Sequence, residues 1–124
     1  MVTGVDFVSI PTRDFSAAAR FYGDVLGLRL SKRYDRVPGG EFETGTVTLQ
    51  LIETEAIGRG FYANLNPVAL RVDDVAAARG ELESQDVVFQ HDTIDTGVCH
   101  MAVFADPDGN LLMLHHRYAA PDVN

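Results

Sequence analysis

The sequence predicts an α+β fold built from two consecutive modules of the same design. Each module has the pattern of a strand, a helix and three further strands, so the order β-α-β-β-β occurs twice. Two sequence echoes support a duplication. RDFSAAAR (13–20) resembles DDVAAAR (73–79), and TVTLQLI (46–52) can be aligned with GNLLMLH (109–115). The offset is about 60 residues in both comparisons, which favours an internal repeat over chance.

In the first module, residues 4–10 alternate and are rich in β-branched and aromatic types, which predicts a strand. A helix is expected over 13–28, with Asp14 as its N-cap and Gly27 as its C-terminal stop. The apolar face of this helix should comprise Phe15, Ala18, Ala19, Tyr22, Val25 and Leu26. PGG (38–40) and Gly45 are predicted to form turns. The three strands that they separate are expected at 28–35, 40–44 and 46–53.

The second module begins after residues 54–66, which contain two glycines and no sustained period and are predicted to be a connecting loop. A strand at 67–72 and a helix at 73–84 follow, the helix capped by Asp73 or Asp74. Three strands complete it, with the sequences DVVFQH, VCHMAVF and NLLMLHH. We expect one domain, with module one at about 1–53, the linker at 54–66 and module two at 67–117.

Composition narrows the class of protein. A chain of 124 residues with 46% hydrophobic residues can bury one core without disulfides, and its single cysteine, Cys99, cannot form one internally. The net charge of −8 argues against nonspecific binding to nucleic acid or to an anionic membrane. No signal pattern or membrane-spanning run is seen, so a cytoplasmic protein is expected.

Two motifs resemble a known superfamily. DFSAAARFYGDVLGLRL is similar to the first helix of the vicinal oxygen chelate superfamily, with its D-x-x-x-[AS]-x-x-FY-x-x-x-LG pattern. VFADPDGNLLMLH is similar to its closing F-x-DPDGN-x-x-E-L motif. The superfamily includes glyoxalase I, extradiol dioxygenases and bleomycin-binding resistance proteins, and the resemblance covers essentially the whole chain. It implies curled mixed sheets around a shared cleft, with the helices outside.

The resemblance also implies where a metal would be held, because the metalloenzymes offer one ligand from the first and one from the fourth strand of each module. Carried over one at a time, these positions fall on Phe7, Gln50, Pro67 and Met113. Phe and Pro cannot ligate a metal, Met prefers soft ions, and Gln is a weak neutral donor. A register shifted by one residue would nominate Glu53 or His116, but each lies an odd number of positions from Gln50 or Met113. Each would therefore face the helix side, together with apolar residues such as Leu51 and Leu114. We therefore expect no metal site and no cofactor.

Other candidate residues leave two interpretations open. His115 shares the face of Met113, where it is either an acid/base group or a hydrogen-bonded histidine at a cavity rim. His91 is expected to be solvated, and His100 structural. Cys99 lacks a neighbouring base motif, which favours a core thiol over a nucleophile. In the DPDG turn, Asx-type capping by the two aspartates explains the sequence better than paired-carboxylate chemistry.

The remaining inward positions predict a largely apolar cavity with sparse polar groups, as small-molecule sites require. Its expected members are Phe7, Ser9, Gln50, Ile52, Met101, Met113 and His115, with Phe61 and Tyr62 as possible lids. The alternative is that these residues simply fill a core.

The leading hypothesis is a metal-free protein, expected to be dimeric by analogy with the superfamily, that binds or sequesters a small aromatic or cationic compound in the sheet cleft. One alternative is a metal-independent lyase or isomerase in which His115 is the acid/base and Gln50 and Tyr62 orient a carbonyl oxygen. A metal-dependent glyoxalase or dioxygenase is the less favoured third.

Overall fold

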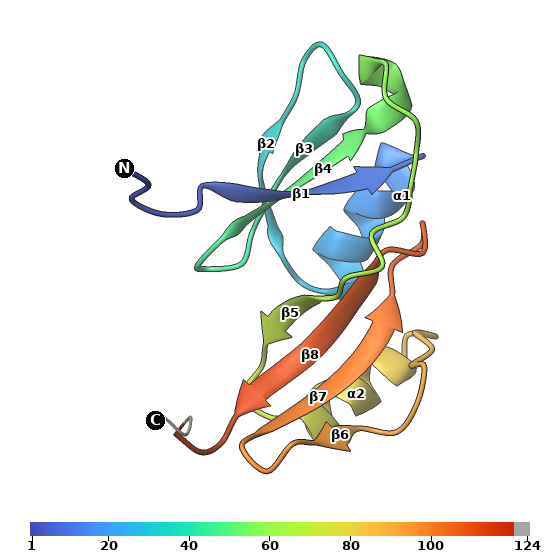
Figure 1. The fold of residues 1–124 in the computed structure, drawn as a ribbon. Helices are drawn as coiled ribbons and strands as arrows, with labels where there is room; N and C mark the ends of the chain where they lie inside the picture. Colours follow the sequence, from blue (N-terminus) through green and yellow to red (C-terminus); the bar gives the residue numbers. More distant parts are fainter. Residues whose placement is uncertain (121–124) are drawn as a thin grey trace. The chain divides into compact units, whose positions relative to one another are not determined.

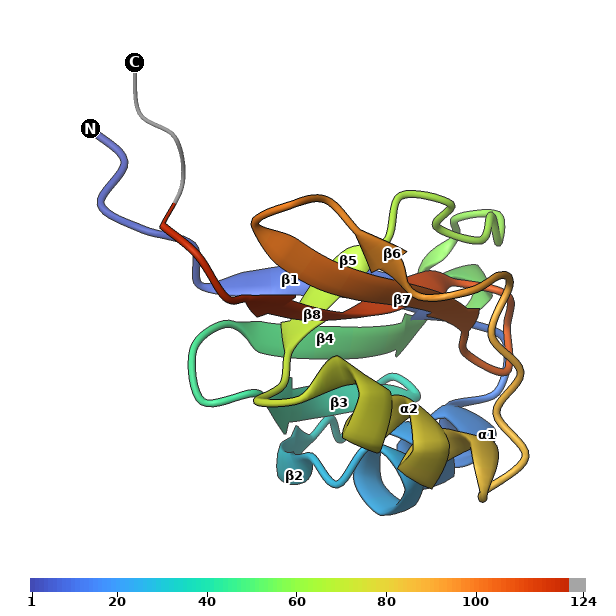
Figure 2. The ribbon, with the colours of Figure 1, turned by 90° about the horizontal axis from the view of Figure 1, so that it is seen from below.

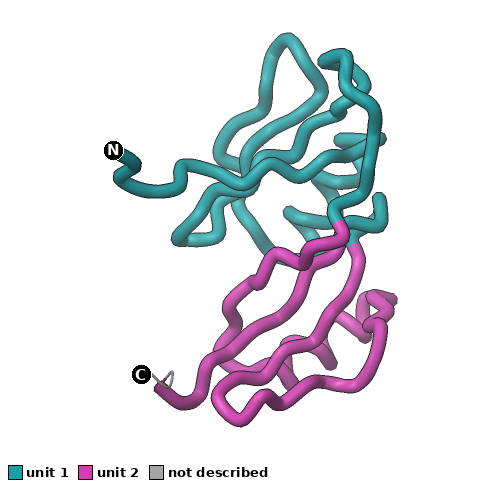
Figure 3. Tube along the Cα trace, in the orientation of Figure 1, with its two compact units in different colours: residues 1–64, 106–110 teal, residues 65–105, 111–124 magenta. Residues whose placement is uncertain are grey.

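The computed structural model describes residues 1–120 and divides the chain into two compact units. Unit 1 comprises residues 1–64 and 106–110, and unit 2 comprises residues 65–105 and the described residues from 111 onward (Figure 3). The turn between the last two strands of the chain therefore belongs to unit 1, although those strands belong to unit 2. None of the helices within residues 1–120 has the length and apolar character needed to cross a membrane.

Unit 1 contains the first sheet, with strand order β1-β4-β3-β2 (Figure 1). Its elements are β1 (Phe7–Thr12), α1 (Phe15–Arg20), a π-helix (Phe21–Val25), β2 (Arg29–Arg33), β3 (Gly39–Glu43), β4 (Thr48–Glu53) and a 3₁₀ helix (Thr54–Ile57). β1 runs parallel to β4, and the other two pairings are antiparallel.

Unit 2 repeats this arrangement with strand order β5-β8-β7-β6. Its elements are β5 (Val68–Arg71), α2 (Val75–Glu83), β6 (Ile94–Asp95), β7 (Cys99–Ala105) and β8 (Leu111–Arg117). The first strand again runs parallel to the last, and the other pairings are antiparallel. The predicted α+β fold, with the β-α-β-β-β order used twice, is confirmed.

The first helix begins where the sequence predicts and then departs from α geometry. The Asp14 side chain accepts a 3.2 Å hydrogen bond from the Ala17 amide, as an N-cap does. From Phe21 onward the turns widen into a π-helix, and the Leu26 amide bonds to the Phe21 carbonyl. Gly23, a weak helix former, lies in this stretch. Gly27, at a φ of +74°, ends the helix.

The core of unit 1 lies between α1 and one face of the first sheet. Phe15, Ala18 and Tyr22 from the helical segment are buried there. The sheet contributes Ile10, Phe42, Leu49 and Leu51, each at most 1% exposed. Because side chains alternate along a strand, the neighbouring residues of β1, β3 and β4 must project from the opposite, open face.

The core of unit 2 lies between α2 and the second sheet, where α2 packs along β7 and β8 (Figures 1 and 2). The Asp74 side chain caps α2 by accepting a 3.0 Å hydrogen bond from the Ala77 amide, which settles the choice between Asp73 and Asp74. The side chains buried in this core include Val75, Leu82, Phe89, Ala102, Phe104, Leu112 and Leu114.

Three sequence-based expectations were wrong in detail. DVVFQH does not form a strand. Asp86 adopts a φ of +67° after α2, and only a single bridge joins Phe89 to Phe104, so the edge strand is Ile94–Asp95 instead. The expected loop 54–66 starts with a 3₁₀ helix. Gly39 and Gly40 are buried residues of β3 rather than a turn, because a Cβ on Gly40 would lie 2.6 Å from the Lys32 carbonyl oxygen.

The DPDGN turn at 106–110 is organised by Asp106. Its Oδ1 accepts hydrogen bonds from the amides of Asp108 and Asn110, each 2.9 Å long. Gly109 adopts a φ of +86°, as a turn glycine can. The expectation of Asx-type capping is confirmed for Asp106. Asp108 has another role, because its carboxylate accepts hydrogen bonds from the Thr12 hydroxyl and the Arg13 amide at the end of β1.

Candidate functional site

The open face of the first sheet carries a chain of polar side chains that runs across neighbouring strands. Ser9 on β1 is paired with Gln50 on β4, and Gln50 is paired with Glu41 on β3. Tyr34 follows β2 directly. These four residues are partly or fully exposed, so their polar groups are within reach of a ligand.

The hydrogen bonds of this chain all point in one direction. The Ser9 hydroxyl donates to Gln50 Oε1 at 2.7 Å, and Gln50 Nε2 donates to the Tyr34 hydroxyl at 3.0 Å. The Tyr34 hydroxyl in turn donates to Glu41 Oε2 at 2.6 Å. Desolvation, and then the hydrogen bond to Glu41, raise the pKa of Tyr34 above its usual value. The phenol therefore remains a donor at neutral pH.

A second acidic group lies in the next row of the same face. Glu43 accepts hydrogen bonds from the Ser31 hydroxyl and, at 2.7 Å, from the Thr48 hydroxyl. These two bonds, in that order, lower the pKa of Glu43 below its usual value, so the group is ionised at neutral pH. Phe7 is paired with Thr48 and is 50% exposed beside this row. The face thus combines carboxylates with exposed apolar surface.

The expected lid residues lie in the loop of unit 1. The guanidinium carbon of Arg13 lies 4.0 Å from the centre of the Phe61 ring, which is partly buried. Tyr62 is 82% exposed. Ile52 is the remaining predicted residue in this unit. It lies two residues after Gln50 on β4 and is paired with Pro11 on β1. All six residues predicted from the first module and the linker therefore belong to unit 1.

The other predicted residues belong to the open face of the second sheet. Met101 is paired with His115, and Val103 with Met113. This agrees with the expectation that Met101 and Val103, rather than His100, share the face of His115. Arg71 lies beside His115 on β5 and is exposed. Among the described residues, the His115 imidazole has no hydrogen-bond or ion-pair partner.

The remaining histidines and the cysteine have local partners. His100 Nε2 lies 3.4 Å from Asp95 Oδ2, and His116 Nδ1 lies 3.0 Å from the Val72 carbonyl oxygen. His91 is exposed, as expected. Cys99 is buried, and its sulfur accepts a 3.4 Å hydrogen bond from Thr96.

The donor set does not fit a catalytic metal. The direct neighbour of Gln50 on the parallel strand is Ser9 rather than Phe7, and that of Met113 is Ala69 rather than Pro67, which precedes β5. Both polar groups of the Gln50 amide are already hydrogen-bonded to protein. Within residues 1–120, no three His, Cys, Asp or Glu side chains are grouped so that they could hold a metal ion.

Sequence reasoning missed Tyr34, Glu41 and Glu43. The alternation in GEFE, at 40–43, placed both glutamates opposite the core residue Phe42 and could have revealed them. Tyr34 gave no comparable signal, because its position depends on an irregularity between Leu30 and Lys32 in the pairing of β2 with β3.

Comparison with known proteins gives a consistent result. The model of the Glyoxalase/Bleomycin resistance protein/Dioxygenase superfamily matches residues 4–114. The uncharacterized protein YwbC of Bacillus subtilis (strain 168) is 29% identical over 103 residues, which span 77% of this chain and 82% of that protein.

Two solved structures illustrate the range of proteins that share this fold. TnmS3, an antibiotic binding protein from Streptomyces sp. CB03234, has a TM-score of 0.79 at 23% identity, covering 94% of this chain and 97% of TnmS3. Lactoylglutathione lyase from Agrobacterium tumefaciens has a TM-score of 0.75 at 20% identity, covering 92% of this chain and 93% of the lyase. A binding protein and an enzyme thus have the same fold, so the fold does not choose between these functions.

Proposed function

Because the chain belongs to the Glyoxalase/Bleomycin resistance protein/Dioxygenase superfamily, we propose that it is a metal-independent protein that binds or sequesters a small organic compound on the open face of its sheets. The observation that carries this proposal is the directed chain from Ser9 through Gln50 and Tyr34 to Glu41. A fixed polar chain on an accessible sheet face can orient a ligand, whereas it would be costly to maintain in a core.

The hydrogen-bonding groups that these four side chains leave unused define the ligand chemistry. Glu41 uses only one carboxylate oxygen for Tyr34, so its other oxygen can accept a bond from a ligand. Gln50 retains one N–H, and the ionised Glu43 lies one row away. We propose a compound with a donor group, such as a protonated amine or a hydroxyl, attached to an apolar body that packs on Phe7 and Ile52. The antibiotic-binding function of TnmS3 makes antibiotics the first compounds to examine.

The test is a thermal-shift screen of aromatic compounds and antibiotics that carry amines, followed by calorimetry on two variants. Gln50→Ala and Glu41→Gln should each weaken binding by at least about tenfold, because each removes a charge-assisted or amide hydrogen bond. Glu55→Gln is the matched control, since Glu55 is an exposed glutamate of the 3₁₀ helix that follows β4 and has no hydrogen bond to the four residues of this site. Equal binding by wild type and both variants would contradict the proposed site.

A second candidate, a metal-independent lyase or isomerase, is favoured by one observation. The His115 imidazole lies on the open face of the second sheet without a protein partner in the described chain, so it can exchange a proton with a bound molecule. Turnover of a compound found in the screen should then be lost in His115→Ala. Activity that persists in that variant would remove this candidate.

Assembly and location form part of the proposal. We propose a homodimer that acts in the cytoplasm. Sedimentation velocity on the purified chain tests the assembly, and a species with the 13.6 kDa mass of one chain at all concentrations would contradict the dimer.

A further inference from the structure

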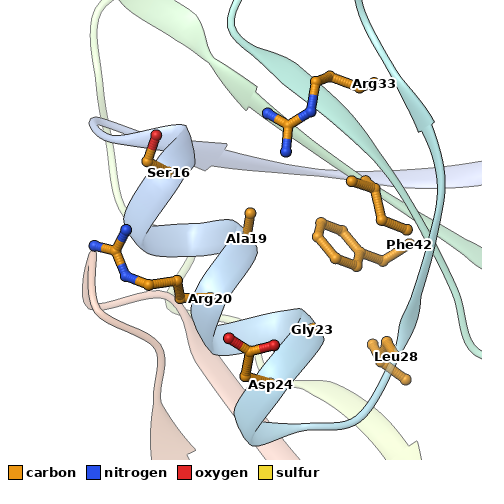
Figure 4. Close-up of a pocket in the computed structure, with 9 residues that line it drawn as sticks. Ser16, Ala19, Arg20, Gly23, Asp24, Leu28, Arg33 and Phe42 are labelled. Atoms are coloured by element: carbon orange, nitrogen blue, oxygen red, sulfur yellow. The ribbon is translucent and has the colours of Figure 1, made fainter.

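A cavity of about 500 Å³ lies in unit 1 on the helix side of the first sheet, opposite the face that carries Gln50. It is bounded by α1 and the π-helix on one side and by β2 and β3 on the other (Figure 4). Its volume is within the range of small-molecule sites, about 300–1,000 Å³. This cavity is separate from the site proposed above.

Small residues on one helical face create the space. Ser16, Ala19 and Gly23 follow one another at spacings of three and four, so they line the same side of the helical segment. A Cβ on Gly23 would lie 3.7 Å from Cε1 of Phe42, an ordinary contact distance. Phe42 is only 1% exposed and closes the bottom of the space, so the accessible apolar surface comes from residues around it. Leu28 and Leu30 extend this apolar surface along the strand side.

The two arginines that line this cavity lack ion-pair partners among the described residues. Within the described chain, no carboxylate oxygen lies within 4.0 Å of a side-chain nitrogen of Arg20 or Arg33. The Arg33 guanidinium carbon lies 5.1 Å from the centre of the Phe15 ring, which orients the group. In Figure 4 this guanidinium is turned toward the helix across the cavity, and Asp24 lies on the helix farther along.

We propose that this cavity binds a small organic monocarboxylate, with the carboxylate on Arg33 and the apolar body on Leu28 and Leu30. The planar guanidinium matches a carboxylate with two parallel hydrogen bonds. Figure 4 shows the Arg33 guanidinium turned toward the cavity and that of Arg20 turned away from it, so the lining offers one cation to one carboxylate. A dianion such as a phosphate monoester would add repulsion from Asp24 in a chain whose net charge is already −8.

The test uses 2-naphthoate as the probe and two-dimensional NMR of the ¹⁵N-labelled full chain. Saturable shifts are expected at the amides of Gly23 and Phe42. Its neutral analogue 2-naphthamide should bind at least about tenfold more weakly, because it lacks the charge that Arg33 recognises. Naphthyl phosphate should also bind more weakly than 2-naphthoate.

Three variants locate the binding. Arg33→Gln should weaken 2-naphthoate binding by at least about tenfold, whereas Arg36→Gln should leave it unchanged, since Arg36 is an exposed arginine of the following turn that does not line the cavity. Ala19→Leu should block binding by filling the space. Arg33 is itself exposed, so its replacement tests the proposal even where Ala19→Leu disturbs folding.

Three outcomes would overturn the inference. The first is no saturable shift at Gly23 or Phe42 up to about 1 mM probe, the weak end of small-ligand affinity. The second is equal binding by wild type and Arg33→Gln. The third is a set of shifts confined to Ser9 and Gln50, which would assign the probe to the opposite face of the sheet and leave the proposed function untouched.

Discussion

The Tyr22 hydroxyl donates a 2.7 Å hydrogen bond to Oδ2 of Asp106 across 84 residues of sequence. Both side chains are buried, Tyr22 at 0% and Asp106 at 5% exposure. The same oxygen accepts a 2.8 Å bond from Asn110 Nδ2, whose amide group also donates to the Pro11 carbonyl at the end of β1. One carboxylate thus ties the first helical segment, β1 and the DPDGN turn together within unit 1.

Removal of the phenol hydroxyl tests this connection. Tyr22→Phe should lower the free energy of unfolding by about 1–3 kcal/mol, because it leaves a buried carboxylate oxygen one hydrogen bond short. Urea denaturation followed by circular dichroism measures the change. Tyr62→Phe is the control, since Tyr62 is 82% exposed and should change stability by less than about 0.5 kcal/mol. Equal effects of the two substitutions would contradict the role given to Tyr22.

The same contact predicts a loss of stability at alkaline pH. Burial, followed by the charge of Asp106 and the hydrogen bond to it, raises the pKa of Tyr22 far above the ordinary value of 10.0. A phenol whose pKa is raised in the folded state makes its full contribution to the free energy of unfolding below pH 10. This contribution falls as pH rises further, because only the unfolded chain releases the proton.

The measurement is the free energy of unfolding between about pH 8 and pH 11, in wild type and in Tyr22→Phe. Wild type should lose up to about 1.4 kcal/mol per pH unit more than the variant above pH 10. Parallel pH profiles for the two proteins would show that Tyr22 ionises as readily in the folded state as in the unfolded one.

The helix caps were predictable from sequence because they are local. Asp14 and Asp74 each precede an apolar period, and each caps its helix in the structure. The polar chain on the open face was not predictable, because it depends on register between strands. The irregularity between Leu30 and Lys32 shifts β2 by one position, and such a shift exchanges the faces of all residues beyond it. Tyr34 therefore lies on the same face as Gln50, whereas a regular alternation counted from Leu30 would place it on the core face.

The strand expected at DVVFQH shows a different limit. Its composition favours a strand, but Asp86 leaves the preceding helix at a positive φ and Val88 remains 81% exposed. Phe89 is the residue of this segment that is buried in the core, and its ring centre lies 5.2 Å from that of Phe104. Tertiary packing of one aromatic side chain determines the path of this segment, and local propensity does not.

The adjacent aspartates before α2 offer a matched pair of substitutions. Asp74→Ala should destabilise the protein by about 1 kcal/mol, because the Ala77 amide loses its capping acceptor. Asp73→Ala removes the same charge one residue earlier without removing the cap, so it should cost less than about 0.5 kcal/mol. Denaturant unfolding of both variants compares them directly. A larger effect at Asp73 would place the start of the helix one residue earlier than the structure does.

Metal retention decides between the proposed function and metal-dependent chemistry. The superfamily resemblance implies ligands at Phe7, Gln50, Pro67 and Met113, and the strand neighbours of Gln50 and Met113 are Ser9 and Ala69. Three of these six side chains offer no donor atom, Ser9 and Gln50 offer only neutral oxygen or nitrogen atoms, and the Met113 thioether favours soft ions. The tag-free protein should therefore retain no stoichiometric nickel, zinc, manganese or iron(II) after incubation and dialysis, as measured by elemental mass spectrometry. Stoichiometric retention that is lost in His115→Ala would contradict the metal-independent proposal and make His115 a ligand, whereas retention unaffected by that substitution would assign the ion to other side chains.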